Sequence, residues 1–128
     1  MADSLVEAAR RAREQAYAPY SKYKVGAALE GTDGSVHLGC NVENASYGLT
    51  VCAERVAVGS AIAAGVTRFR RVAIVTDSDP PAAPCGACRQ VLAEFAPDAE
   101  VIAVGPARTL SWRVRDLLPA AFSRGQLG

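Results

Sequence analysis

The chemically most informative residues of this chain are three cysteines and one acid. Cys52-Ala53-Glu54 stands in one segment, and Pro84-Cys85-Gly86-Ala87-Cys88 follows further along the chain. The C-x-x-C spacing lets two sulfurs on one helical turn reach a single ion, and Cys52 supplies a third sulfur from elsewhere. Catalytic zinc is tetrahedral, accepts thiolates and keeps one position open for water. The pattern therefore predicts a zinc site that activates water.

Glu54 lies two residues after a proposed ligand, at the expected start of a helix. This position suits it poorly as a fourth ligand and well for moving protons between water and a substrate nitrogen. The alternative is an ordinary first-turn acid, which the positive end of a helix dipole favours. Beside three candidate ligands, we interpret Glu54 as the catalytic acid and base.

Three thiolates and Zn²⁺ carry a combined charge of about −1, which weakens the metal as a Lewis acid. The charge must be offset if water is to ionise near neutral pH. Two helix N-termini can contribute, because their free N–H groups favour thiolates. Arg55, next to this cluster, is predicted to donate hydrogen bonds to the sulfurs.

Cys40 and His37 are the other candidates for metal or proton chemistry. If Cys40 bound the metal, the site would be closed and structural; its place after Gly39 in a strand pattern favours a small buried side chain instead. His37 is the one histidine of the chain and lies far from both motifs, so a solvated position on the same strand is expected.

The composition indicates one globular domain that spans residues 1–128. Half of the residues are apolar, 21% are charged and the net charge is +1, which argues against a partner bound through its phosphates. No segment has the roughly 20 apolar residues of a membrane span, and no secretory signal is expected. We therefore expect a cytoplasmic protein with reduced thiols and with neither a membrane nor a nucleic-acid partner.

Apolar periodicity and turn residues predict the order helix, hairpin, helix, strand, helix, strand, which is typical of an α/β fold with helices on a mixed sheet. Both cysteine segments lie where a loop enters a helix. The apolar tail, including Trp112, Leu117 and Phe122, is expected to dock on the fold, and the region 105–115 shows no interpretable pattern. The expected helices are 3–17, 52–64 and 86–95, and the expected strands are 25–30, 35–42, 71–76 and 101–104.

Four segments, in order, resemble the small homotetrameric cytidine deaminases. They are residues 18–29, which include Pro19-Tyr20-Ser21, residues 41–55 and 84–92, which carry the metal motifs, and residues 117–122. The resemblance covers nearly the whole chain. It implies a three-layer α/β/α sandwich around a mixed sheet, and a homotetramer with active sites at the subunit interfaces.

The resemblance also implies roles for individual residues. Zinc is bound by Cys52, Cys85 and Cys88, and Glu54 moves protons. The ribose hydroxyls are held by Asn41 and Glu43, and the backbone around Ala53 reads the carbonyl edge of the pyrimidine. Tyr23 and Phe122 pack around the ring, with Phe122 donated by a neighbouring subunit, while Ala45 and Tyr47 approach the ribose of an adjacent subunit's site.

Other interpretations of these residues remain open. Asn41 and Glu43 could cap a loop, and each aromatic residue could belong to the core. Tyr23 stands where the family often has Phe, so its hydroxyl needs a partner, and it could contact the sugar or water and alter the preference among nucleosides.

The expected activity is zinc-dependent deamination of cytidine and 2′-deoxycytidine in pyrimidine salvage, with a small pyrimidine nucleoside as the partner. One alternative is deamination of a cytosine nucleoside antibiotic such as blasticidin S. Another is a non-catalytic module in which Cys40 closes the zinc site. A nucleic-acid editor is a further alternative, which the charge balance does not favour.

Overall fold

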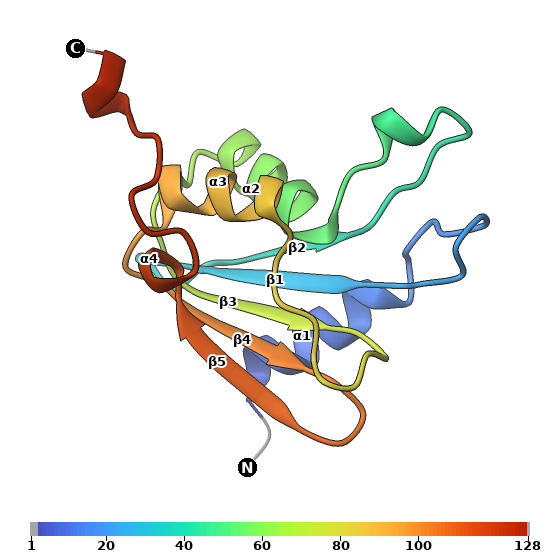
Figure 1. Cartoon of the computed structure of the whole chain (residues 1–128). Coiled ribbons are helices and arrows are strands. Elements are labelled where there is room, and N and C mark those ends of the chain that lie inside the picture. The colour runs from blue at the N-terminus through green and yellow to red at the C-terminus, as the bar shows by residue number, and fades with distance from the viewer. Residues whose placement is uncertain (1–2, 128) are drawn as a thin grey trace.

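The computed structural model describes residues 3–127 and contains a five-stranded sheet with helices on both of its faces (Figure 1). The helices are α1 (Ser4–Arg13), α2 (Ala53–Ala63), α3 (Gly86–Phe95) and the short α4 (Val114–Leu117), with 3-10 turns η1 (Tyr47–Leu49) and η2 (Arg124–Leu127). The strands are β1 (Gly26–Gly31), β2 (Val36–Cys40), β3 (Phe69–Val75), β4 (Glu100–Val104) and β5 (Thr109–Arg113).

The sheet is mixed, with the strand order β2-β1-β3-β4-β5. β3 and β4 are parallel and α3 connects them, whereas the other neighbouring pairs are antiparallel. Gly26 at the start of β1 pairs with Cys40 at the end of β2 and with Val75 at the end of β3. The segments before β1, after β2 and after β3 therefore emerge at the same end of these strands. Both cysteine motifs also lie at this end of the sheet.

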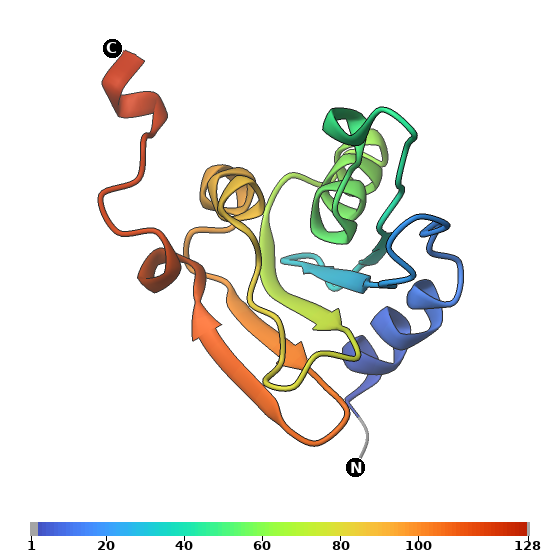
Figure 2. The ribbon, with the colours of Figure 1, turned by 45° about the vertical axis from the view of Figure 1, so that its right-hand side comes forward.

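Side chains that alternate along the strands build two separate cores. Leu29, Val72 and Val101 face α2 and α3, together with Ala57 and Leu92 from those helices. Their neighbours Ala28, Ala73 and Ile102 face α1. Because successive strand residues point to opposite faces, the sheet is covered on both sides. The predicted three-layer α/β/α arrangement is confirmed (Figures 1 and 2).

Two glycines allow helices to lie directly on the sheet. A Cβ atom at Gly39 of β2 would lie 2.3 Å from the Ala53 carbonyl oxygen and 2.4 Å from the Ala57 nitrogen of α2. A Cβ at Gly26 would lie 2.0 Å from the Ala9 carbonyl oxygen of α1. Real Cβ atoms do not approach backbone this closely, so the position of the first turn of α2 depends on a glycine in β2.

Several element boundaries differ from the prediction. The first helix ends at Arg13 rather than at residue 17, because the next amides form single turns and Tyr17 N–H then donates to the Asn41 carbonyl. β2 ends at Cys40, so Asn41 and Glu43 lie beyond the regular strand. Val42 between them still bridges both Tyr17 and Val51. β3 begins two residues earlier than predicted, with Phe69 buried.

The region around Trp112 forms a strand that the sequence analysis did not find. β5 pairs antiparallel with β4 at the edge of the sheet, and its residues are mostly exposed, so it lacks the apolar run of a buried strand. Trp112 and Leu117 do dock against the core that faces α2 and α3. The last residues extend away from the sheet, and Phe122 is 57% exposed, so the tail docks only in part (Figure 2).

None of the helices within residues 3–127 has the length and apolar character that crossing a bilayer requires.

The packing of α2 on β2 predicts opposite effects for two Gly→Ala changes. Gly39→Ala places a methyl group against the backbone of α2, and we expect it to lower the free energy of unfolding by about 1–3 kcal/mol. Gly59→Ala lies in the same helix, where nothing stands within 4 Å of the new methyl group, and we expect about 0.5–1 kcal/mol of stabilisation. Urea unfolding at one protein concentration measures both. Equal effects of the two variants would contradict the proposed close approach.

Candidate metal centre and active site

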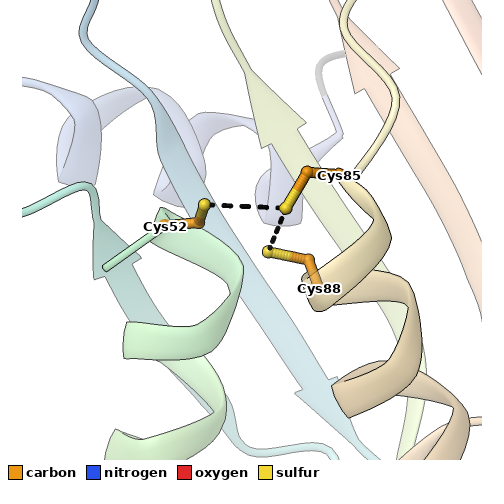
Figure 3. A group of neighbouring side chains, drawn as sticks. All are labelled: Cys52, Cys85 and Cys88. Atoms are coloured by element: carbon orange, nitrogen blue, oxygen red, sulfur yellow. Dashed lines mark hydrogen bonds between the residues drawn. The ribbon is translucent and has the colours of Figure 1, made fainter. Parts of the chain in front are cut away.

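Two helix N-termini converge on the cysteine cluster. Cys52 is the residue before α2, Cys85 is the residue before α3, and Cys88 lies one turn into α3 (Figure 3). Their placement at loop–helix junctions confirms the sequence prediction. Both helices direct their free N–H groups and positive dipole ends toward this point, which favours thiolates.

The distances between the sulfurs match a tetrahedral metal site. The Sγ atoms of Cys52 and Cys85 lie 3.8 Å apart, and those of Cys85 and Cys88 lie 3.5 Å apart. Sulfurs on one tetrahedral zinc ion, each at about 2.3 Å, lie about 3.8 Å from one another. Within residues 3–127, the ligand atoms gathered within 4.8 Å of one another are these three sulfurs, without Cys40 or Glu54. The geometry therefore fits zinc with three protein ligands.

The electrostatics of the three-cysteine cluster favour a bound cation. Hydrogen bonding from Cys88, together with the Arg55 guanidinium, lowers the pKa of Cys52 to about 5. The hydrogen bond with Cys52 and burial raise the pKa of Cys88 above its ordinary range. One thiol of the group thus ionises at the expense of another, and three thiolates at these distances require a positive ion between them.

Arg55 lies where it can offset part of this negative charge. Its Nη2 atom donates to Cys52 Sγ at 3.6 Å, from the first turn of the helix that follows the cysteine. Contact with the sulfur in turn raises the pKa of Arg55. This contact agrees with the sequence prediction for Arg55. The effect of Arg55 on the bound metal stays a prediction.

Glu54 is almost completely buried beside the sulfurs, with 5% of its surface exposed. Burial raises the pKa of Glu54 to about 6. A carboxyl group whose pKa lies near neutrality can both accept and donate a proton under physiological conditions. Glu54 belongs to the first turn of α2 and therefore lies at the same end of the sheet as the ligands.

A cavity of about 300 Å³ adjoins the cluster, at the small end of the range for ligand sites. It brings together most of the residues that the sequence analysis selected. They are Tyr23, Asn41, Glu43, Cys52, Ala53, Glu54 and Cys85. Although β2 ends before Asn41, the bridges formed by Val42 leave Asn41 and Glu43 on the same cavity wall.

Asn41 and Glu43 also hold the segment that precedes β1. The Asn41 side chain accepts from Val25 N–H at 2.9 Å and donates to the Tyr23 carbonyl at 2.7 Å. One donor hydrogen and one lone pair of its amide remain for a ligand. Glu43 accepts from the backbone N–H of Tyr20 and from Ser21, and the Ser21 hydrogen bond keeps the pKa of Glu43 below its usual value.

Three of the predicted substrate contacts lie outside this cavity. Ala45 is exposed, and Tyr47, which is 77% exposed, lines a neighbouring hollow that shares Ser21 and Glu43. Phe122 lies in a different cavity beside α3, where its carbonyl accepts from Gln90 Nε2 at 2.9 Å. Within one chain, therefore, Ala45, Tyr47 and Phe122 are not brought together with the cysteines.

The structure adds residues that the sequence analysis did not select. Ser21 and Thr50 line the cavity with their hydroxyl groups, and Val25 and Ala83 supply apolar wall. Ser78 contacts the Tyr23 hydroxyl from the loop after β3. Ser21 and Thr50 fall inside the segments of family resemblance, which is the one signal that could have pointed to them. No such sequence signal points to Ser78, because its partner Tyr23 is 55 residues away in the chain.

Comparison with known proteins agrees with this geometry. The model of the cytidine and deoxycytidylate deaminase zinc-binding region matches residues 1–104. The chain belongs to this family. A cytidine deaminase of Sporosarcina psychrophila is 45% identical over 127 residues, which cover 98% of this chain and 93% of that protein. A crystal structure of cytidine deaminase from Burkholderia pseudomallei is 53% identical, with a TM-score of 0.91, over 95% of this chain and 100% of the other.

A blasticidin-S deaminase of Bacillus cereus is more distant from this chain, at 29% identity over 112 residues. These residues are 81% of this chain and 80% of that protein. Membership of a zinc-binding deaminase family and the three-sulfur cluster together make zinc the cofactor of this enzyme.

An open zinc site predicts different consequences for two cysteine changes. Cys40→Ala is expected to retain stoichiometric zinc, because Cys40 is not among the clustered sulfurs. Cys88→Ala, which removes a buried ligand, is expected to lose most of the zinc. Metal analysis of both proteins after dialysis measures the difference. Loss of zinc from Cys40→Ala would contradict the open site and favour a closed structural one.

Proposed function

We propose that this protein hydrolyses cytidine and 2′-deoxycytidine to uridine and 2′-deoxyuridine, with release of ammonia. Residues 1–128 act as one catalytic domain. The observation that carries the proposal is the buried Glu54 carboxyl group beside three clustered thiols, at the base of a cavity with an amide and a second carboxylate on its wall.

Cys52, Cys85 and Cys88 would hold the zinc ion, which would supply Lewis-acid activation of a water molecule. Glu54 is the group that handles the protons. It accepts one proton from the attacking water and delivers it to N3 of the pyrimidine. It then takes the proton of the new C4 hydroxyl group and delivers it to the amino group, so that the C4–N bond breaks, ammonia leaves and the C4 carbonyl forms. Arg55 and the two helix N-termini limit the negative charge around the thiolates, so that the activated water forms near neutral pH.

The remaining cavity residues recognise a neutral nucleoside. Asn41 and Glu43 offer donors and acceptors for the ribose hydroxyls, Ala53 presents backbone to the carbonyl edge of the pyrimidine, and the Tyr23 ring forms an apolar wall. Among the described residues that line the cavity, none is Lys or Arg, and Glu43 is acidic. The lining thus offers a phosphate group no Lys or Arg partner, which favours a nucleoside over a nucleotide.

The complete site is proposed to form in a homotetramer. Tyr47 and Phe122 are exposed aromatic side chains away from the cavity of their own chain, and exposure of large apolar residues is typical of surfaces that associate. In such an assembly, Phe122 covers the pyrimidine of a neighbouring subunit, and Ala45 and Tyr47 approach the ribose in an adjacent subunit's site. We also propose a cytoplasmic location and a role in pyrimidine salvage, with neither nucleic acid nor a membrane as a partner.

Two other activities fit the observations less well. Deamination of blasticidin S is less well supported, because the relative with that name is 29% identical, against 45% for the cytidine deaminase of Sporosarcina psychrophila. A non-catalytic zinc module gives no reason for a buried carboxyl group beside an open coordination position. Turnover of cytidine and of blasticidin S distinguishes the proposed activity from the first alternative. The zinc content of Cys40→Ala distinguishes it from the second.

An ultraviolet assay with zinc analysis tests the proposed reaction. We expect loss of cytosine absorbance with cytidine and 2′-deoxycytidine, and at least about tenfold lower kcat/KM with cytidine 5′-monophosphate, a difference of about 1.4 kcal/mol, because the cavity lining offers the phosphate no cation. Blasticidin S serves as the third substrate. Equal turnover of the nucleotide would contradict the assignment of a neutral nucleoside site.

Replacement of Glu54 tests the proton-transfer role. Glu54→Gln preserves the size and hydrogen-bonding capacity of the side chain but cannot accept the proton, so kcat is expected to fall by about 10²- to 10⁴-fold. Zinc content and the unfolding transition should stay close to those of the unchanged protein. Glu14→Gln, on the exposed end of α1, is the matched control and should keep full activity. Near-normal turnover by Glu54→Gln would refute the role.

A further inference from the structure

Two segments that are far apart in the sequence are joined through Tyr23, a residue of the cavity wall. The Tyr23 hydroxyl, from the segment before β1, is hydrogen-bonded to Ser78 Oγ, from the loop that follows β3. Beside this contact, Arg13 of α1 donates to the Lys24 carbonyl at 2.9 Å and forms an ion pair with Asp77. Tyr23–Lys24 and Asp77–Ser78 are thus connected twice, once through a phenol and once through a guanidinium group.

We propose that Ser78 is a positioning residue of the active site, acting through the Tyr23 phenol. The pair of connections, which we call the cavity clamp (Arg13, Tyr23, Asp77 and Ser78), fixes the Tyr23 ring on the cavity wall before a substrate arrives. This inference rests on the proposed function, because the ring is the surface against which the pyrimidine packs.

The Tyr23 side of the clamp is built with little freedom. Lys22 has a φ of 63°, in the left-handed region that costs a residue with a side chain about 1 kcal/mol or more. Ser21 holds this turn by accepting from Tyr23 N–H at 3.0 Å, while Ser21 and Tyr20 are themselves bound to Glu43. The turn therefore aims the Tyr23 side chain toward the loop after β3 rather than leaving it free to rotate into solvent.

The Ser78 side is anchored to the far half of the sheet. Thr76 N–H donates to the Val104 carbonyl at 3.0 Å, and Arg108 pairs with Asp79 at 3.0 Å. The Ser78 carbonyl oxygen lies so close to Gly105 that a Cβ there would approach it within 2.4 Å. The same loop continues to Cys85, which is a zinc ligand. The clamp consequently links the aromatic wall to the loop that delivers a ligand to the metal.

The hydrogen bond between the Tyr23 hydroxyl and Ser78 has a consequence for nucleoside preference. A hydroxyl group bound to Ser78 is not directed at the sugar, so the tyrosine contributes its ring face and its fixed position. Changes at Tyr23 or Ser78 should then weaken binding of cytidine and 2′-deoxycytidine to the same extent. Discrimination at the 2′ position is assigned to the side chains of Asn41 and Glu43, which also line the cavity.

Steady-state kinetics of five variants test the clamp. Ser78→Ala and Tyr23→Phe are each expected to raise KM about 3- to 10-fold with little change in kcat, and the double variant should be no worse than either single one. Ser78→Thr keeps the hydroxyl and should restore KM, whereas Ser60→Ala, on the exposed side of α2, should change nothing. Additive losses in the double variant, or a changed ratio of the two nucleosides, would overturn the proposal.

Hydrogen exchange provides a readout that does not depend on turnover. In Ser78→Ala, peptides that cover residues 20–25 and 76–84 should exchange faster than in the unchanged protein, while those of α2 keep their rates. Unchanged exchange in both segments would overturn the clamp even if cytidine is a substrate. If the unchanged protein does not convert cytidine, the proposed function fails, and the exchange result still decides whether the clamp exists.

Discussion

The close approach of three thiols is the constraint on which this molecule depends. Three thiols whose sulfurs lie 3.5 and 3.8 Å apart cannot all ionise unless a cation lies between them. The pKa of Cys52 is lowered while that of Cys88 is raised, because ionisation of one thiol disfavours ionisation of the other. Two helix N-termini and one guanidinium group reduce the negative charge but do not remove it. The site is thereby built for a metal whose coordination by protein stops at three ligands.

The packing at the start of α2, which positions Cys52, also raises the proton affinity of the neighbouring Glu54. The first turn of α2 lies on β2 because Gly39 has no side chain, and Glu54 in that turn is buried two residues after Cys52. Burial raises the pKa of Glu54 to about 6. The position of Cys52 and the raised pKa of Glu54 therefore both depend on how the start of α2 packs on β2.

Several residues at the site serve the fold and the ligand together. Asn41 and Glu43 use part of their hydrogen-bonding capacity to hold the segment before β1 and leave the rest facing the cavity. Their loop-stabilising role and their proposed substrate role are therefore compatible. The two interpretations of Asn41 and Glu43 do not exclude each other. The Tyr23 hydroxyl also has its partner within the protein, in Ser78.

The amino-acid sequence by itself determined the ligand set, the acid beside it, the start of both site helices and the α/β class. These features are local, because C-x-x-C spacing, helix signals and strand alternation act over a few residues. Only the tertiary structure decided which segments meet at the edge of the sheet, the exclusion of Cys40 from the cluster and the contact between Tyr23 and Ser78. β5 escaped prediction because an exposed edge strand has no buried face to mark it. The physical reason is the same in each case: pairing between distant segments depends on backbone hydrogen bonds and on the shape of a packed core, which local patterns do not encode.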